Sequence, residues 1–300
     1  MKVLAAILTH NRKDLLARCI RNVQAQSRPP DALLVVNNAS TDGTEEMLQA
    51  LGIPYVTQAN VGSAGGWHRC VQHALERGFD AVWLMDDDGY PDVEALYQLE
   101  GALGNGVACA SSIVVREDDP SRFVFPFPVL NRRRLPALFA FPRKIATVAE
   151  LHAVAPEGTY PFAHFFNGAL VSLAATSQVG NVNEDFFIFG DEVDYFCRLR
   201  AAGEVVSVLS ALHYHPDVSQ RPYTAAKVYY YVKNTLILNA RYFDAVWLRH
   251  GAAVAAVLAR TGRRNGWGAA LSLVAGRSAP MFYAAIARGL AGRLGKDFHG

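Results

Sequence analysis

The chain has 300 residues, of which 51% are hydrophobic, and its formal net charge is +2. A chain of this length and hydrophobicity can bury a large core, which excludes a disordered protein and predicts one domain of roughly 200 to 250 residues with an appendage. The four cysteines lack the spacing of metal sites or disulfide pairs, so we expect reduced core thiols. The apolar run at 3–8 is too short for a signal peptide and is interpreted as the first strand of a cytoplasmic protein.

Positive charge is concentrated at the C-terminal end. Residues 245–300 contain eight basic side chains and one acid, a net charge of +7, whereas the first 244 residues sum to −5. A segment this basic is expected to meet an anionic partner. Its uncharged stretches are shorter than the roughly 18 to 20 apolar residues of a spanning helix, so we predict amphipathic helices lying on an anionic membrane surface. The alternative is a helical cap on the rest of the chain or a contact within a homo-oligomer.

The first half alternates short apolar runs with amphipathic stretches, which is the rhythm of parallel βαβ units. Strands are predicted at 3–8, 32–37, 55–58, 81–85 and 107–115. Helices are predicted between them, at roughly 13–26, 44–51, 66–76 and 93–103. Ligands of such sheets bind beyond the carboxyl ends of the strands, so the residues that follow each strand are the candidates for chemistry.

The second half departs from this rhythm. Residues 116–160 hold six prolines and a basic cluster at 132–134, which predicts an irregular insertion over the site. A strand near 165–172, a helix near 192–202 and a strand near 205–215 follow, and from 225 onward the chain reads as Ala-rich helices. We therefore predict one domain over 1–224, made of parts 1–115, 116–160 and 161–224, and a basic helical region over 225–300.

Three consecutive carboxylates, Asp86, Asp87 and Asp88, follow the apolar strand at 81–85. Alternation along a strand puts Asp86 and Asp88 on one face and Asp87 on the other. Adjacent like charges repel, so a cation is the usual reason to keep them together, and carboxylate oxygens suit a hard divalent metal that also binds a diphosphate. The alternative is a solvated turn continuing into Gly89.

A glycine-rich stretch, from Asn60 through Gly62, Gly65 and Gly66, enters the third predicted helix. Glycines at a helix N-terminus let backbone N–H groups approach phosphate oxygens, and Arg69 in the same helix can add positive charge. The spacing matches neither the dinucleotide fingerprint nor a Walker sequence. A tight turn from strand to helix explains the glycines equally well.

Together, the residues 9–12, 36–44, 60–66 and 86–88 resemble family 2 glycosyltransferases, and among them the bacterial rhamnosyl- and galactofuranosyltransferases. The resemblance runs from residue 2 to about residue 240. It implies an α/β fold of the GT-A type, with a single Rossmann-like nucleotide-binding sheet covered by helices on both faces, plus a C-terminal helical region.

The resemblance also implies roles for particular residues. The nucleotide-binding set is Thr9, Asn11, Arg12, Asn37, Asn60, Gly62, Gly65, Gly66, Arg69, Asp86 and Asp87. Position 37 usually holds an aspartate that contacts base or ribose, and the asparagine here is a departure from the family. The Asp-x-Asp pair, Asp86 and Asp88, implies binding of the divalent metal and the diphosphate.

Two motifs of the second half complete the implied site. Asp191 and Glu192 resemble the family's acidic motif at the start of a helix, in which the second acid, here Glu192, is the general base. Acids also favour a helix N-terminus because of its dipole, which would need no catalysis. A metal-ligating histidine is implied after the next strand, where His213 and His215 both fit and His215 is favoured. The segment 229–234 resembles a Tyr-Tyr-x-x-Arg-Asn run of the same sub-branch.

The activity implied is metal-dependent, inverting transfer of a sugar from a UDP- or dTDP-linked donor to a glycan or lipid-linked glycan acceptor in cell-surface polysaccharide synthesis. Galactofuranose or rhamnose is favoured as the sugar, and Mn or Mg as the cation. One alternative is a nucleotidyltransferase, but this class requires a Gly-rich loop after the first strand and residues 9–12 contain no glycine. The other alternative is a non-catalytic protein that binds sugar nucleotides or glycans. No nucleic-acid partner is expected, and the expected location is cytoplasmic, peripheral on the inner face of the cell membrane.

Overall fold

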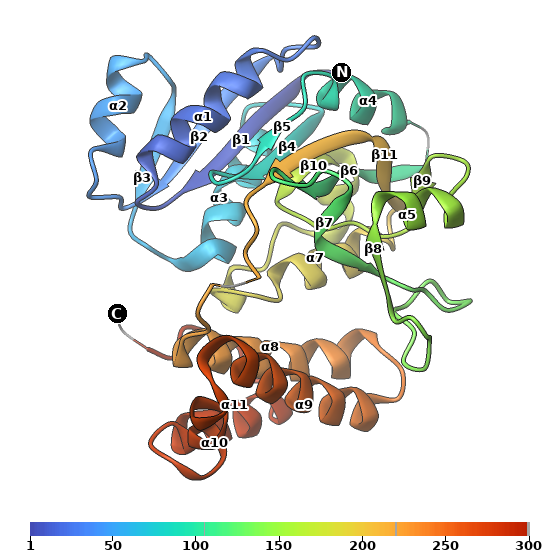
Figure 1. Ribbon diagram of the computed structural model, residues 1–300. Helices are drawn as coiled ribbons and strands as arrows, with labels where there is room; N and C mark the ends of the chain where they lie inside the picture. The colour runs from blue at the N-terminus through green and yellow to red at the C-terminus, as the bar shows by residue number, and fades with distance from the viewer. Residues whose placement is uncertain (105, 220, 299–300) are drawn as a thin grey trace.

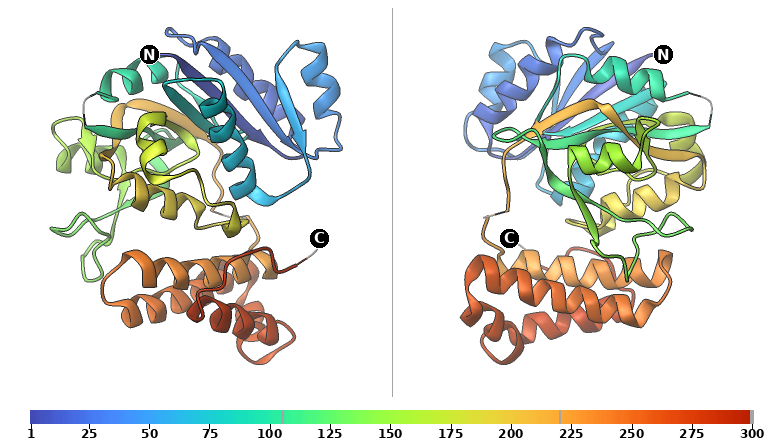
Figure 2. Two further views of the ribbon diagram at one scale, coloured as in Figure 1. Left: turned by 180° about the vertical axis from the view of Figure 1, so that it is seen from behind. Right: turned by 45° about the vertical axis from the view of Figure 1, so that its right-hand side comes forward.

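The computed structural model describes residues 1–104, 106–219 and 221–298. One β-sheet carries helices on both of its faces, and four further helices form a layer on one side of this α/β unit (Figures 1 and 2). The main path of the sheet has the strand order β3-β2-β1-β4-β10-β6-β11-β5. The predicted α/β fold with a C-terminal helical region is confirmed.

The N-terminal part of the sheet is parallel, as its apolar runs predicted. Its strands are β1 (Val3–Thr9), β2 (Ala32–Asn38), β3 (Tyr55–Gln58) and β4 (Ala81–Asp86). The helices that connect them are α1 (Lys13–Gln24), α2 (Thr44–Ala50) and α3 (Gly62–Glu76). The third helix begins four residues earlier than predicted, because the glycines of its first turn were assigned to a loop.

Both faces of the sheet are covered by core residues, which alternate along the central strand. In β1, Val3, Ala5 and Ile7 pack against α1, α2 and α4 (Ala95–Ala102). Leu4, Ala6 and Leu8 point to the opposite face, toward α3 and α7 (Asp191–Leu199). Since a strand buried on both faces needs a continuous apolar run, the sequence of β1 is explained by its central position.

The second half of the sheet is mixed rather than parallel. Strand β10 (Asn167–Ser172) runs antiparallel between β4 and β6 (Val107–Arg116). Strand β11 (Glu204–His215) is parallel to β6, and β5 (Tyr90–Pro91) pairs with its end. Asp86 N–H donates to Phe166 O just before β10 (2.7 Å), so the chain entering β10 closes the carboxyl end of β4.

The prediction that residues 116–160 are irregular was wrong. This segment contains β7 (Arg122–Pro128), β8 (Lys144–Thr147), α5 (Val148–Val154) and β9 (Thr159–Tyr160). A capping box between Thr147 and Glu150 begins α5. Prolines are tolerated in strands that make few ladder hydrogen bonds, and β7 has only sparse pairing with β6 and β8. The prolines are therefore the reason why these strands were not predicted from the sequence.

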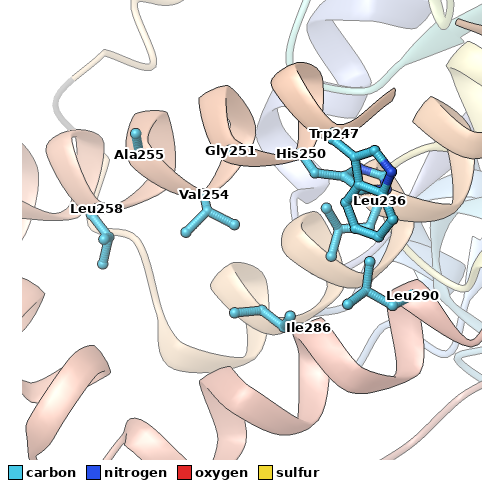
Figure 3. A pocket seen from close by; sticks show the side chains of 9 residues that line it. All are labelled: Leu236, Trp247, His250, Gly251, Val254, Ala255, Leu258, Ile286 and Leu290. Carbon is cyan, nitrogen blue, oxygen red and sulfur yellow. The ribbon is translucent and has the colours of Figure 1, made fainter. Parts of the chain in front are cut away.

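The C-terminal helices are α8 (Ala225–Tyr242), α9 (Val246–Asn265), α10 (Trp267–Ala275) and α11 (Ala279–Leu290). They share a core of their own that also contacts residues 187–189, just before α7. In the described part of the chain, no single helix has the length and hydropathy of a membrane span; only α10 and α11 taken together do, and they are bent by 66°. An apolar hollow of about 370 Å³ lies between α8, α9 and α11, lined by Trp247, Val254 and Leu290 among others (Figure 3).

Candidate active site

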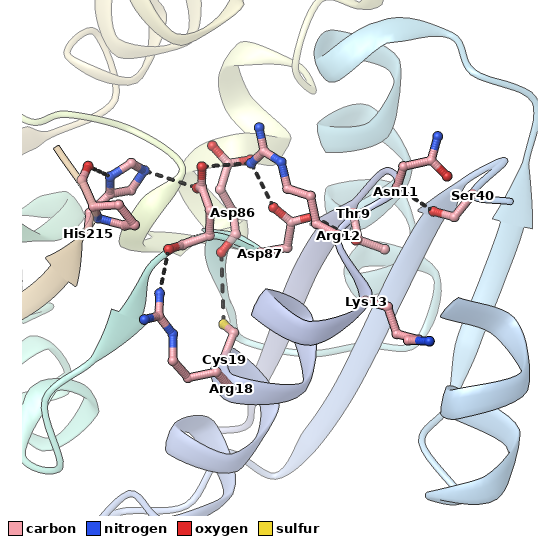
Figure 4. Close-up of polar contacts among 12 residues, drawn as sticks. Thr9, Asn11, Arg12, Lys13, Arg18, Cys19, Ser40, Asp86, Asp87 and His215 are labelled. Carbon is pink, nitrogen blue, oxygen red and sulfur yellow. Dashed lines mark hydrogen bonds and ion pairs between the residues drawn. The ribbon is translucent and has the colours of Figure 1, made fainter. Parts of the chain in front are cut away.

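The three carboxylates lie where β4 ends, as predicted, but they are not arranged by strand alternation. Strand β4 ends at Asp86, and Asp87 and Asp88 form the turn that follows. The guanidinium of Arg12 contacts both, at 3.0 Å from Asp87 Oδ1 and 2.7 Å from Asp88 Oδ2 (Figure 4). Thr9 Oγ1 also donates to Asp87 Oδ2, at 2.6 Å. The prediction that Asp87 points away from Asp88 was therefore wrong, because alternation stops where the strand does.

Asp88 is paired with His215, which arrives from the end of β11. His215 Nε2 lies 3.0 Å from Asp88 Oδ1, while the other ring nitrogen, Nδ1, lies 2.7 Å from the carbonyl of Pro216. A carbonyl only accepts, so Nδ1 carries a proton, and Nε2 is the ring nitrogen that faces the carboxylate. Such a contact needs a proton or a cation between the two atoms. Metal-ligating histidines are oriented in this way by a backbone carbonyl behind them.

The donor set therefore fits a divalent cation, with Asp88 and His215 as the residues that would hold it. Among the described residues, no three His, Cys, Asp or Glu side chains surround one point closely enough to hold a metal by themselves. The remaining ligand positions would fall to oxygens of a substrate, which is how diphosphate-bound cations are commonly held. Arg221 also contacts Asp88 Oδ2, at 3.1 Å.

His213, the other histidine predicted as a ligand, does not reach Asp88. Its ring is fully buried with no hydrogen-bond partner for either nitrogen. A Cβ added to Gly89 would lie 2.2 Å from His213 Nε2, and one added to Gly168 would lie 3.2 Å from Nδ1. Burial lowers the pKa of His213 to about 3, so the ring is neutral. It fills the space beneath the turn, and both glycines are needed to make room for it.

The carboxylates differ in how easily they ionise. Burial, reinforced by the charges of Asp88 and Asp87, raises the pKa of Asp86 well above its usual range. Burial also raises the pKa of Asp87, although Arg12 and Thr9 oppose the shift. Burial also acts to raise the pKa of Asp88. The hydrogen bond and charge of His215, together with Arg12, outweigh this effect and hold the pKa of Asp88 below its usual range. Of the three carboxylates, Asp88 is therefore the one whose ionised form the surroundings favour.

The loops after β1 and β2 join in a polar rim beside the carboxylates. Asn11, at a left-handed φ of 54°, accepts a hydrogen bond from the Thr41 N–H (2.7 Å) and donates its own N–H to Ser40 Oγ (2.9 Å). His10 Nδ1 lies 2.7 Å from Asn38 O. His10, Asn38 and Ser40 lie in the motif segments 9–12 and 36–44 but were given no role of their own from the sequence, because their contacts join two loops that are 28 or more residues apart.

Two asparagines predicted to bind nucleotide are occupied by loop contacts. Asn37 is fully buried; its Oδ1 accepts from Ser40 N–H (3.0 Å) and its Nδ2 donates to Thr57 Oγ1 (3.3 Å). Asn60 Oδ1 accepts from Gly62 N–H (3.1 Å) at the start of α3. Arg69 donates to Gln72 within the same helix (3.5 Å). These contacts support the loops that form the rim.

The glycines at the start of α3 are explained by packing. A Cβ added to Gly62 would lie 2.0 Å from Phe187 O, and φ there is +80°. A Cβ on Gly66 would lie 2.3 Å from a methyl of Leu8, and one on Gly65 would lie 2.5 Å from a methyl of Val61. The first-turn N–H of Ala64 already donates to Phe187 O (3.2 Å). Packing therefore explains the glycines without a bound phosphate, and their role in phosphate binding stays a prediction.

Gly66→Ala is expected to lower the free energy of unfolding by about 1 to 3 kcal/mol, since the new methyl overpacks the contact between α3 and β1. Gly101→Ala is the matched control, because Gly101 lies in helix α4 with nothing within 4 Å of its Cβ position. It should raise the free energy of unfolding by about 0.5 to 1 kcal/mol, as alanine favours the helix. Urea unfolding of the two variants measures both, and equal effects would contradict the packing explanation.

The acidic motif lies at the start of α7, close enough to the end of β4 for the charge of Glu192 to act on Asp86. Gly190, at φ 94°, precedes the helix, and Glu192 in its first turn is exposed to solvent. Desolvation of its carboxylate raises the pKa of Glu192 to about 7, and the charge of Glu192 in turn raises the pKa of Asp86. Asp191 is buried; burial and the neighbouring Glu192 raise its pKa to about 8. Glu192 is therefore the acid of this pair that solvent or a substrate can reach.

Asp194 and Asn234 have structural partners that fix α7 and the loop before it. Asp194 is buried and receives hydrogen bonds from Arg198 (2.8 Å) and from the Tyr242 hydroxyl (2.6 Å). Asn234 Nδ2 lies within 3.0 Å of the carbonyls of residues 186, 188 and 189, in the loop that leads to Gly190. This explains the 229–234 segment, since its asparagine holds the loop that presents Glu192.

Two cations of the site were missed. Arg18 Nη2 donates to the backbone carbonyl of Asp88 (3.0 Å), and its guanidinium lies over the ring of Tyr90. Arg221 lies in the connection between β11 and α8. Neither belongs to a periodic pattern or a motif. The signal that existed was electrostatic, because three adjacent carboxylates require cations close by.

Comparison with known proteins identifies the family of the chain. The profile of the family described as "Glycosyl transferase family 2" matches residues 5–147. A galactofuranosyltransferase, GlfT1, of Mycolicibacterium smegmatis is 33% identical over 222 residues, which is 71% of this chain and 70% of that protein. GlfT1 of Mycobacterium tuberculosis H37Rv is 34% identical over 225 residues, with the same coverage.

Solved structures show the same fold at low identity. A mannosyltransferase, PcManGT, of Pyrobaculum calidifontis, in complex with GDP-Man and Mn²⁺, has a TM-score of 0.56 and 17% identity, covering 97% of this chain and 86% of that one. GalNAc-T7 with UDP, GalNAc and Mn²⁺ has a TM-score of 0.60 and 12% identity over 82% of this chain, which spans about half (49%) of that protein. Because the GlfT1 relatives are at least 33% identical and match more than two thirds of both chains, this chain belongs to glycosyltransferase family 2 and is a glycosyltransferase.

Proposed function

We propose that the protein is a metal-dependent, inverting glycosyltransferase that moves galactofuranose or rhamnose from a UDP- or dTDP-linked donor to a glycan or lipid-linked glycan acceptor. The observation that carries this proposal is the pairing of Asp88 with His215 Nε2 at 3.0 Å, together with an exposed Glu192 whose pKa is raised to about 7 and whose charge acts on Asp86. The GlfT1 relatives favour galactofuranose. The reaction would serve cell-surface polysaccharide synthesis from the cytoplasmic side.

The donor would lie along the carboxyl ends of β1, β2 and β4. The rim formed by residues 10–11 and 38–41, with Asn60 Nδ2 at 3.4 Å from His10 Nε2, would receive the nucleotide, and the diphosphate would lie near Arg12 and Asp88. Arg12 is 40% exposed and can turn from the carboxylates to phosphate oxygens when a donor arrives. A bound Mn or Mg ion, held by Asp88 and His215, would supply positive charge to the departing diphosphate.

Glu192 would act as the general base. Its carboxylate takes the proton of the acceptor hydroxyl as that oxygen bonds to the anomeric carbon, and the bond from this carbon to the diphosphate breaks on the opposite side. One in-line displacement of this kind inverts the configuration. A pKa of about 7 suits the role, because a base whose pKa is near the working pH is both available and strong enough.

Incubation of the purified protein with a set of UDP- and dTDP-linked sugars is the direct test. We expect hydrolysis of one donor in the presence of Mn²⁺ or Mg²⁺ and faster turnover when a glycan acceptor is added. Excess chelator is expected to stop both, and the product should show inverted anomeric configuration by NMR. Full turnover in chelator would refute metal dependence, and retention would refute the single displacement. Absence of hydrolysis and transfer with every donor would favour a non-catalytic sugar-nucleotide-binding protein.

A further inference from the structure

Helix α10, Trp267–Ala275, is apolar on every side and yet only one side of it is covered. Ala270 and Leu273 are buried in the helical layer. On the opposite side, Trp267, Leu271 and Val274 are 65%, 69% and 41% exposed. Their spacing of four and then three residues puts them in one stripe along the helix. A helix that is hydrophobic all round is normally enclosed, so this stripe is a surface with a missing partner.

The surroundings of this stripe are positively charged. Arg263 and Arg264 end α9 just before it, and Arg277 follows it directly. The single acid of 245–300, Asp297, is neutralised by Lys233 and Arg288. In the described part of the chain, no carboxylate forms an ion pair with Arg263 or Arg277, both of which are exposed. The charge beside the stripe is therefore available to an anionic partner.

We propose that the exposed stripe of α10 docks on an anionic lipid surface. Trp267, Leu271 and Val274 enter the boundary between headgroups and acyl chains, and Arg263 and Arg277 meet the lipid phosphates. Tryptophan favours this boundary because its ring is apolar while its N–H stays hydrated. An apolar stripe flanked by arginines is the pattern of helices that lie in the plane of a membrane surface.

Helix α10 would lie in the plane of the membrane surface and would not span the membrane, because of its length and the packing of α11. Nine residues of α helix extend about 14 Å, roughly half of the hydrocarbon core. Helix α11 cannot add the rest, because Phe282, Ala285 and Gly289 hold it in the protein. A Cβ added to Gly289 would lie 2.8 Å from Lys233 O, so α11 and α8 are in close contact.

A second copy of the chain is a poorer partner for the stripe than a lipid surface. Two stripes placed face to face would bring the arginines of both copies together, and like charges oppose such a contact. The position of α10 suits a planar surface, because both views show it at the end of the molecule away from the sheet (Figures 1 and 2). The α/β unit would then stand above the membrane on its helical layer.

Vesicle flotation of the full chain without donor tests this proposal. We expect the protein to float with vesicles of phosphatidylcholine mixed with phosphatidylglycerol, and not with phosphatidylcholine alone. The variant L271E/V274E should lose at least tenfold in binding, because charged side chains cannot enter the acyl boundary. The variant R263Q/R277Q should lose roughly fivefold per arginine at low salt, with a smaller loss at high salt. The control V93E/Y97E alters two apolar residues that are 50% and 60% exposed on the α/β unit, and it should bind like the unaltered protein.

Three outcomes would overturn the proposal. One is that the unaltered protein fails to float with anionic vesicles, and another is that V93E/Y97E weakens binding as much as L271E/V274E does. The third is a dimer in size-exclusion chromatography that L271E/V274E converts to a monomer, without vesicle binding, which would make the stripe a contact between copies. Thermal unfolding of L271E/V274E checks its fold, and R263Q/R277Q tests the same surface without touching the apolar stripe. Since no donor is present, failure here leaves the proposed glycosyl transfer untouched.

Discussion

Asp88→Asn is expected to reduce sugar transfer about 10³-fold, the scale of several kcal/mol of charge stabilisation at a metal. Asp88 is the carboxylate of the cluster whose pKa is lowered and the one in contact with His215. Asparagine keeps the shape of the side chain and removes its charge, so the loss should appear as weaker Mn²⁺ activation together with lower turnover. Initial rates across a Mn²⁺ titration measure both effects.

The fold should survive this substitution. The two arginines that lose a charged partner, Arg12 and Arg221, are 40% and 42% exposed and can be hydrated instead. Asp92→Asn is the matched control, because Asp92 lies four residues further on and contacts the Tyr214 hydroxyl rather than the cations of the cluster. Near-normal transfer by Asp88→Asn, or an equal loss in Asp92→Asn, would contradict the role given to Asp88.

Asp87→Ala should reduce turnover less than Asp88→Asn does, but it should lower the free energy of unfolding more. Asp87 accepts the Thr9 hydroxyl at 2.6 Å and pairs with Arg12, so its removal leaves a buried threonine hydroxyl without that acceptor. Such a group costs about 1 to 3 kcal/mol. Urea unfolding and the Mn²⁺ titration separate the two effects, and a loss of Mn²⁺ activation as large as that of Asp88→Asn would contradict the distinction between the two carboxylates.

Much of the fold could be predicted because its determinants are local. Apolar runs and amphipathic periods located the parallel strands and their helices to within a few residues, as β1 and β4 illustrate. The outer strands β7 and β8 were missed, since their sparse pairing tolerates prolines that normally exclude a strand. The antiparallel insertion of β10 was missed too, because strand order depends on contacts between distant segments.

The candidate site shows the same limit. Asp88 and His215 were identified by motif, but their contact joins positions 127 residues apart in the chain. Arg221 carries no motif and is defined only by the charge it meets. Strand alternation misplaced Asp87, since it holds only while the strand continues. Asn234 was recognisable as part of a resembling segment, whereas its hydrogen bonds to the loop before α7 required the structure.

Glu192→Gln is expected to keep donor and metal binding while losing roughly 100-fold or more in turnover, the scale of a general-base contribution. Glu192 is the exposed acid at the start of α7, whereas Asp194 is occupied by Arg198 and Tyr242 and Asp191 is buried. Glu192→Asp should be intermediate, since the carboxylate remains but is withdrawn by one methylene. Asp191→Asn should retain most turnover, because burial raises the pKa of Asp191 to about 8 and keeps it protonated near neutral pH.

The pH dependence gives the sharper test. A base acts only when deprotonated, and the pKa of Glu192 is raised to about 7, so kcat/KM should fall about tenfold per pH unit below pH 7 and level off above it. In Glu192→Gln this acid limb should disappear, because the remaining slow reaction no longer depends on that proton. A merely structural role for Glu192 would lower the rate and leave the limb in place. The assignment fails if Glu192→Gln transfers normally while Asp191→Asn or Asp194→Asn abolishes transfer with donor binding unchanged.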